Sequence, residues 1–135
     1  MCRVIGIRCV PLLSSIMKTI FLDIDGTIFY QSDRCDEVYR TQPGLIKGSA
    51  KKCWQWHQKG YNIILTTGRP ESSRKWCEQA LAHHNIVYDQ LIMSLKPWPR
   101  YLINNDRWRP SDQRDDLTAF ANTIPTNHGI SDLDI

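Results

Sequence analysis

The chain has 135 residues, with 17 Lys and Arg against 14 Asp and Glu and a formal net charge of +3. This length suits one domain with a core of its own. Its 41% hydrophobic and 23% charged residues are ordinary for a soluble globular protein. Two of the basic residues lie in the first sixteen positions, so the remainder is close to neutral. The charge balance therefore gives no argument for nucleic-acid or membrane binding.

Residues 1–16 are basic and moderately apolar, with Pro11 among them. They lack the clear apolar core and small-residue cleavage site of a signal peptide, and no stretch approaches the ~18 apolar residues of a membrane-spanning helix. We expect Met17 to be the natural start and residues 1–16 to be an extension, with a short extra edge strand as the alternative. Five cysteines without a CxxC spacing indicate a reducing, cytoplasmic setting rather than a disulfide framework.

Two carboxylates, Asp23 and Asp25, end an apolar run that begins at Thr19. Such a run, bounded by turn residues, predicts a buried strand, and open α/β sheets bind ligands at the carboxyl ends of their strands. Gly26 lets the backbone turn sharply, and Thr27 adds a hydroxyl beside the acids. Because two close carboxylates repel each other, the pattern favours Mg²⁺, which prefers oxygen ligands. The alternative is a plain Asp-Gly turn with solvated acids.

The segment 46–59 predicts a helix, with Trp54 on the apolar face and Trp56 at the surface. Cys53 and His57 lie four residues apart on this helix and could share a metal. A buried cysteine beside a half-exposed histidine is the simpler interpretation, because zinc sites need further paired ligands.

A second strand, residues 61–66, runs directly into a glycine turn, and Pro70 suits the first turn of a second helix. A strand, a tight turn and a helix N-terminus make an anion site, because free N–H groups point out of the helix end. We therefore expect Thr67 and Gly68 to bind phosphate, with Thr66 as the alternative threonine. A plain strand-to-helix turn is the simpler interpretation.

The segment 87–94 predicts a third strand, and Lys96 follows it on the same edge of the sheet. An ammonium group there would offset the charge of a phosphoryl group. A fourth strand is predicted over residues 100–103, and it ends in the turn formed by residues 104–106. Beyond that turn the pattern predicts two further elements, a short helix over residues 115–121 and a last short strand and tail over residues 123–135.

The Asp-x-Asp-Gly-Thr stretch, the threonine that ends the second strand, Lys96 and the acid-bearing turn follow one another in order, each at a predicted strand end. In this the sequence resembles the haloacid dehalogenase (HAD) superfamily of phosphotransferases. Residues 30–44 are interpreted as a flap, too short for a cap domain. Lys96-Pro97-Trp98 resembles small capless members linked to capsular polysaccharide synthesis. The resemblance implies an α/β, doubly wound (Rossmann-like) parallel sheet, with the HAD-like core over residues 17–130.

The resemblance also implies a mechanism and a metal. Asp23 would attack phosphorus to form an aspartyl-phosphate, and Asp25 would act first as acid and then as base. The phosphoryl oxygens would be held by Thr67, Gly68 and Lys96. The ligands of Mg²⁺ would be Asp23, the backbone carbonyl of Asp25, and Asp106 with Asn105 as the alternative. Counted from Lys96, the family's acidic pair falls on Asn104 and Asn105, so this chain departs from the pattern there.

The substrate implied is a phosphate monoester, with a sugar phosphate as one option, and an open capless site accepts small or bulky esters. Two other functions stay open. A phosphatase acting on nucleic-acid ends would grip the backbone with Arg100, Arg107 and Arg109, although the near-neutral charge argues against it. A non-catalytic phosphate-binding protein is favoured by the Asn-Asn turn. The sequence does not predict an oligomeric state.

Overall fold

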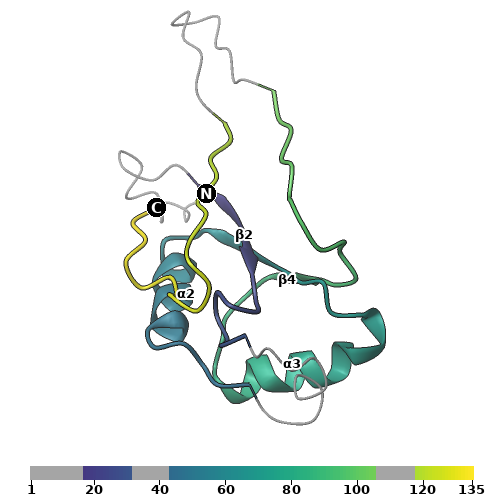
Figure 1. The fold of residues 1–135 in the computed structure, drawn as a ribbon. Coiled ribbons are helices and arrows are strands. Elements are labelled where there is room, and N and C mark those ends of the chain that lie inside the picture. Colours follow the sequence, from purple (N-terminus) through teal and green to yellow (C-terminus); the bar gives the residue numbers. More distant parts are fainter. Residues whose placement is uncertain (1–16, 32–42, 106–117) are drawn as a thin grey trace, which may run out of the picture.

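The computed structural model of this protein describes residues 17–31, 43–105 and 118–135 (Figure 1). They contain a parallel sheet of strand order β2-β3-β4, which confirms the predicted α/β class. The strands are β2 (Thr19–Asp23), β3 (Asn62–Thr66) and β4 (Gln90–Ile92). The helices are α2 (Ser49–Gln58), the 3₁₀ turn η3 (Glu71–Ser73) and α3 (Arg74–His83). In the described ranges, no helix has the length and apolar character needed to span a bilayer.

Both long helices pack on one face of the sheet. Along β2 only the alternate residues Ile20 and Leu22 are buried, and both belong to the hydrophobic core. Successive right-handed crossovers that advance in one direction place their helices on the same side. The helix residues in this core are Cys53 and Trp56 of α2 and Cys77, Ala80 and Leu81 of α3. The other face of the sheet carries Phe21 and Ile92, which are both exposed.

The predicted burial of the two tryptophans of α2 is wrong. Trp56 is 1% exposed and lies in the core, whereas Trp54 is 48% exposed and its ring lies 5.5 Å from that of His57. The prediction counted the helical period from residue 46, but the helix begins at Ser49. Its buried stripe is therefore Ser49, Cys53 and Trp56, at the i, i+4 and i+7 positions.

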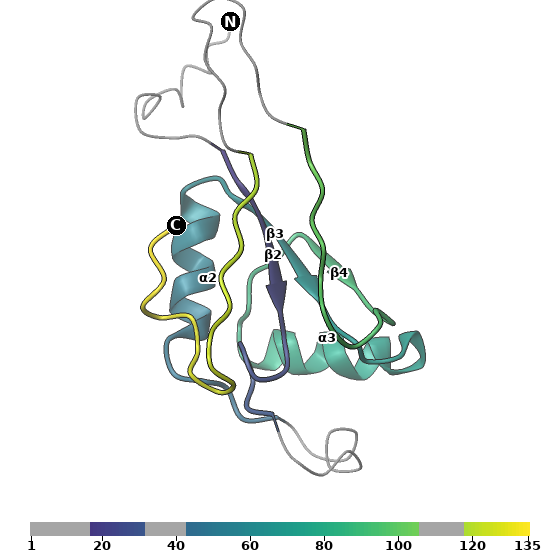
Figure 2. The same ribbon diagram turned by 45° about the horizontal axis from the view of Figure 1, so that its top comes forward.

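The predicted fourth strand, residues 100–103, is not formed. Tyr101 and Ile103 are 87% and 91% exposed, and the segment pairs with none of the described strands. The cause is local, because Ser94 and Trp98 adopt positive φ angles of 61° and 50° and turn the chain away after β4. The segment then runs past the sheet toward the amino-terminal end of β2 (Figures 1 and 2).

The C-terminal segment is ordered without being a strand, so the prediction for residues 123–135 is also wrong. Ile130 is fully buried in the core, and Leu133 packs against it. Lys52 Nζ of α2 donates to the Leu133 carbonyl at 2.8 Å. Of the predicted helix over residues 115–121, the described part, residues 118–121, is not helical, and residues 115–117 lie outside the described residues.

A substitution at Gly129 tests whether residues 129–135 pack on the core. Its φ is +90°, and a Cβ there would lie 2.6 Å from Ile46 Cγ2. We expect Gly129→Ala to lower the free energy of unfolding by about 2 kcal/mol, because it adds both backbone strain and a core clash. Urea unfolding measures this.

Gly44→Ala is the control, because its Cβ would meet Tyr30 Cδ2 at an ordinary 3.4 Å. It should change the free energy of unfolding by less than about 0.5 kcal/mol. Equal effects of the two substitutions would mean that residues 129–135 do not pack on the core.

Candidate active site

The carboxyl ends of β2 and β3 place Asp23 beside Thr66. In the parallel register Asp23 lies opposite Thr66, which in turn lies opposite Ile92 of β4. These three residues share one face of the sheet. Thr67 follows one residue later and is 1% exposed, and its Oγ1 accepts a hydrogen bond from the Arg69 N–H at 3.1 Å. Thr66 is therefore the threonine on the face of Asp23, whereas Thr67 closes the turn.

The second acid of the motif, Asp25, is held by Arg69. Arg69 Nε donates to Asp25 Oδ2 at 2.9 Å, and Nη2 donates to Oδ1 at 2.5 Å. Arg69 is only 5% exposed, and its guanidinium lies 4.9 Å from the ring centroid of Trp76. Its carbonyl accepts from the Ser94 N–H at 2.7 Å. This bidentate pair, in which Arg69 is buried and the Asp25 side chain is 26% exposed, joins the turns that follow β2 and β3.

Sequence reasoning missed the role of Arg69, because it treated the Gly-Arg-Pro turn only as a source of backbone N–H groups. The signal was available in the spacing. Arg69 follows a buried strand directly, at a position where a charge needs a partner, and Trp76 stands seven residues later on the next helix. Asp25, in the turn directly after the neighbouring strand, was an available partner.

Asp23 stays open to a ligand at this edge. The Thr27 hydroxyl donates to Asp23 Oδ2 at 3.2 Å. Partial burial of the carboxyl group raises the pKa of Asp23 above its ordinary value, and repulsion by Asp25 adds to the rise. The hydrogen bond from Thr27 and the positive charge of Arg100 act in the opposite direction. Arg100 is therefore the cation that acts on Asp23 from the segment after β4.

The turn between the acids and the flap is tightly folded. The Ile24 carbonyl accepts from the N–H groups of Thr27, Ile28 and Phe29 at 3.2, 2.9 and 3.1 Å. Gly26, at φ +84°, makes this reversal possible. The Tyr30 N–H then donates to the Gly44 carbonyl at 2.9 Å and closes the stem of the predicted flap. Residues 32–42 of that flap lie outside the described residues.

The predicted site residues are gathered only in part. Asp23 ends β2, and Asp25, Thr67 and Gly68 lie on the two joined turns. Lys96 is exposed, and within the described ranges its ammonium forms no hydrogen bond or ion pair. Further along, the Asn104 side-chain amide donates to the Thr118 carbonyl at 3.4 Å, and the Thr118 hydroxyl donates to the Asn105 carbonyl. The segment that carries these asparagines leads away from the carboxyl edge of the sheet (Figure 2), and Asp106, Arg107 and Arg109 lie outside the described residues.

The donor chemistry at this edge fits Mg²⁺. Asp23 offers a carboxylate on the open face, and the main-chain carbonyl of Asp25 is a second oxygen of the kind this cation prefers. A cation would also relieve the repulsion between the two acids. Among the described residues, no group of three or more His, Cys, Asp or Glu side chains is disposed to hold a metal. The alternative pair in α2 is unsuited, because burial raises the pKa of the Cys53 thiol to about 12 and His57 is exposed.

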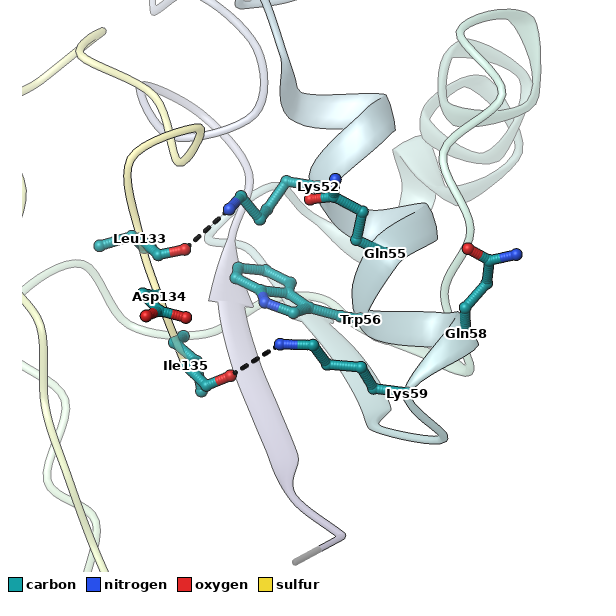
Figure 3. A pocket seen from close by; sticks show the side chains of 8 residues that line it. All are labelled: Lys52, Gln55, Trp56, Gln58, Lys59, Leu133, Asp134 and Ile135. Atoms are coloured by element: carbon teal, nitrogen blue, oxygen red, sulfur yellow. Dashed lines mark hydrogen bonds between the residues drawn. The ribbon is translucent and has the colours of Figure 1, made fainter. Parts of the chain in front are cut away.

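A separate pocket of about 430 Å³ lies between α2 and the C-terminal segment (Figure 3). Lys52 and Lys59 point toward the carbonyls of Leu133 and Ile135, at 2.8 and 3.4 Å. None of the predicted site residues lines it. The pocket therefore belongs to the packing of the chain terminus on α2, and the acids of the strand ends form the site.

A parallel α/β core with an Asp-x-Asp-Gly-Thr turn at a strand end defines a HAD-like domain. Residues 20–98, more than half of the chain, match the family described as PITM 1-3, LNS2 domain. The chain belongs to this LNS2 family, whose domains are HAD-like and of the lipin/Nir type.

This chain is similar to a fly protein in sequence and to a bacterial protein in structure. Protein retinal degeneration B of Drosophila melanogaster is 29% identical over 114 residues, which cover 84% of this chain and 8% of the fly protein. The chain thus spans less than a tenth of the length of that relative. A crystal structure of a structural-genomics target from Vibrio cholerae is 24% identical and covers 71% of this chain and 86% of its own, with a TM-score of 0.45.

The ion pair predicts a measurable cost when Arg69 is lost. Arg69→Met should lower the free energy of unfolding by about 2 to 3 kcal/mol, because it leaves the carboxylate of Asp25 without its buried partner. The double variant Arg69→Met/Asp25→Asn should recover part of this loss, since no charge is then left unpaired. Urea unfolding of the three proteins measures both effects.

Arg74→Met is the matched control. Arg74 pairs with Glu71 and Glu78 and also donates to the Leu91 carbonyl at 2.9 Å. Because its side chain is 35% exposed, its loss should lower the free energy of unfolding by clearly less than the loss of Arg69 does. A cost equal to that of Arg69→Met, or no recovery in the double variant, would contradict the structural role given to the buried pair.

Proposed function

We propose that this domain hydrolyses a phosphate monoester and that Asp23 is the nucleophile. One observation carries the proposal: the two acids of the motif have different surroundings. Asp25 is engaged through both carboxylate oxygens by Arg69, whereas Asp23 forms no ion pair with a described residue and lies on the open face beside Thr66. A carboxylate that is held only by neutral groups, the Thr27 hydroxyl and the Ile24 backbone, can turn an oxygen toward a substrate.

In the proposed reaction an oxygen of Asp23 forms a bond to phosphorus, and the bond from phosphorus to the leaving oxygen breaks. The leaving oxygen takes a proton, and water then attacks the aspartyl-phosphate to release phosphate and restore the Asp23 carboxylate. Asp25, two residues further on, would donate that proton and later accept one from water. One of its two bonds to Arg69 must open for it to do so. When bound, Mg²⁺ would neutralise the developing charge on the phosphoryl group, held by Asp23 and the carbonyl of Asp25.

Three groups support phosphate binding at the same edge. Gly68 lies exposed in the bend between β3 and η3, so its backbone is accessible to a ligand. Thr66 and Thr67 carry hydroxyls on either side of the strand end. Thr66 donates to the Leu22 carbonyl at 3.4 Å and would exchange this bond for one to phosphate, whereas the buried Thr67 hydroxyl accepts from the Arg69 N–H. Lys96 and Arg100 add positive charge from the segment after β4. We propose a small or bulky phosphate ester as the substrate, a sugar phosphate among them. Phe29 and Leu45 pair as an antiparallel bridge, and the stretch between them is too short for a cap domain that would restrict access to the site.

Non-catalytic phosphate binding is the second candidate, and the ion pair itself favours it. A carboxylate that is held at both oxygens by a buried guanidinium is a poor proton donor as it stands. Asn104 and Asn105 also replace the acids that the superfamily places at the fourth motif. In this case the domain would bind a phosphate ester and leave it intact.

The nucleophile assignment predicts the effect of one substitution. Asp23→Asn should lower turnover of a generic phosphate ester in the presence of Mg²⁺ by roughly a thousandfold or more, because the amide cannot form the intermediate. The melting temperature should stay close to that of the unchanged protein. Steady-state kinetics and a thermal unfolding curve measure the two quantities.

Asp132→Asn is the control, because Asp132 is an exposed acid near His128, far along the chain from the motif. It should leave turnover unchanged. Full activity of Asp23→Asn would exclude this mechanism. No turnover by the unchanged protein, together with binding of the ester seen by calorimetry, would support the second candidate.

A further inference from the structure

The segment after β4 is fastened to the turn formed by Thr67, Gly68 and Arg69. The Leu95 N–H donates to the Thr67 carbonyl at 3.1 Å. The Ser94 N–H donates to the Arg69 carbonyl at 2.7 Å. A Cβ at Gly68 would lie 3.4 Å from the Leu95 carbonyl oxygen, so the two backbones are close to contact. The segment therefore leaves the sheet from a fixed position beside the candidate site.

Residues 96–100 continue this segment as a short closed loop, which we call the Trp98 loop. Its two prolines hold their own φ angles at about −65°. Arg100 Nη1 donates to the Lys96 carbonyl at 2.7 Å and closes the loop. Arg100 is also the cation of this segment that acts on Asp23. The closed end of the Trp98 loop therefore lies beside the proposed nucleophile.

Trp98 is both strained and exposed at the middle of this loop. Its φ is 50°, although a following proline normally keeps a residue extended, at a φ of about −120°. The residue is 83% exposed and does not belong to the hydrophobic core. Within the described ranges its ring stacks on no aromatic side chain and its indole N–H has no hydrogen-bond partner. Packing on the described chain therefore does not account for this conformation, and strain of this kind is typical of ligand sites.

We propose that Trp98 stacks on a ring in the leaving group of the substrate, so that the site favours phosphate esters of cyclic alcohols over esters of open-chain alcohols. The inference rests on the proposed binding of the phosphoryl group at Asp23. Trp98 stands two residues before Arg100, so the Cα atoms of the two are at most about 8 Å apart. A leaving group that extends from the phosphoryl group toward the loop would meet the indole ring.

The chemistry of an indole ring decides which leaving groups gain from this contact. Its flat, polarisable face stacks on aromatic bases, and it makes dispersion contacts with the C–H face of a sugar. An open-chain leaving group offers no flat face and gains less. Because the prolines and the Arg100 bond hold the loop in place before binding, little of this gain is lost in ordering the protein.

A comparison of three phosphate esters in the presence of Mg²⁺ tests the inference. Uridine 5′-phosphate, glucose 6-phosphate and glycerol 3-phosphate are all esters of a primary alcohol, and the first two carry a ring. The unchanged protein should have the higher kcat/KM for a ring ester. Trp98→Ala should lower the ratio of kcat/KM between that ester and glycerol 3-phosphate by about tenfold, the size of one stacking contact. The change should lie in KM rather than in kcat, because stacking binds the ground state and the transition state alike.

Trp98→Phe and Trp54→Ala are the matched variants. The first keeps an aromatic face and should retain most of the preference. The second removes a tryptophan that is 48% exposed on α2, and it should leave the ratio unchanged. A loss confined to the glucose ester or to the uridine ester identifies the kind of ring that Trp98 contacts.

Two results would overturn the inference: no preference for either ring ester in the unchanged protein, or an equal loss on all three esters in Trp98→Ala, which a purely structural role would cause. If the unchanged protein hydrolyses none of the esters, the proposed reaction fails, and the dissociation constants of the same esters, measured by calorimetry, test the stacking by itself. Trp98→Ala should then weaken binding of a ring ester about tenfold relative to glycerol 3-phosphate. Equal dissociation constants in the two proteins would overturn the inference.

Discussion

The arrangement of the strand ends depends on the buried pair of Arg69 and Asp25. A guanidinium with 5% exposure must be matched by an acid, because an unpaired buried charge costs several kcal/mol. Asp25 supplies both oxygens, and the Arg69 backbone is fixed by Thr67 on one side and Ser94 on the other. One residue thereby links the turn after β2, the turn after β3 and the segment after β4.

The site turn is held from a second direction by the C-terminal segment. Asn127 donates its backbone N–H to the Gly26 carbonyl, and its side-chain oxygen accepts from the Gln31 N–H at 2.7 Å. These bonds fix both ends of the turn that connects the acids to the flap stem. With Asp25 held by Arg69 and the turn held by Asn127, Asp23 is the acid of the motif that remains open to a ligand. The different surroundings of two neighbouring carboxylates are the physical basis for giving them different roles.

The parts of the fold that rest on short apolar runs could be predicted from the sequence. The runs before Asp23 and before Thr67 became β2 and β3, and the glycine turns between strands and helices placed the acids and Thr67 at one edge. Burial within α2 could not be predicted to the residue. A shift of three residues in the helix start exchanges Trp54 and Trp56 between surface and core. The sequence has no N-cap side chain before Ser49 that would have marked it as the first residue of the helix.

The structure of the segment after β4 could not be predicted from the sequence for a different reason. Residues 100–103 have the composition of a strand, but a strand needs a partner, and the turns at Ser94 and Trp98 direct the chain past the sheet. Such backbone reversals at residues other than glycine leave no clear trace in composition. The ion pair of Arg69 is a contact between residues 44 positions apart, which only the strand register brings together. The LNS2 family match over residues 20–98 confirms the HAD-like class.

Locating the phosphoryl group on the protein tests the central claim most directly. The protein would be mixed with a small, reactive phosphate donor and Mg²⁺, quenched in acid within the first turnover, digested, and sequenced by tandem mass spectrometry. The account predicts a labile phosphoryl group on Asp23 and on none of the other acids, lost on treatment with hydroxylamine. A phosphoryl group on Asp25, or steady turnover with no phosphorylated aspartate at any quench time, would contradict it.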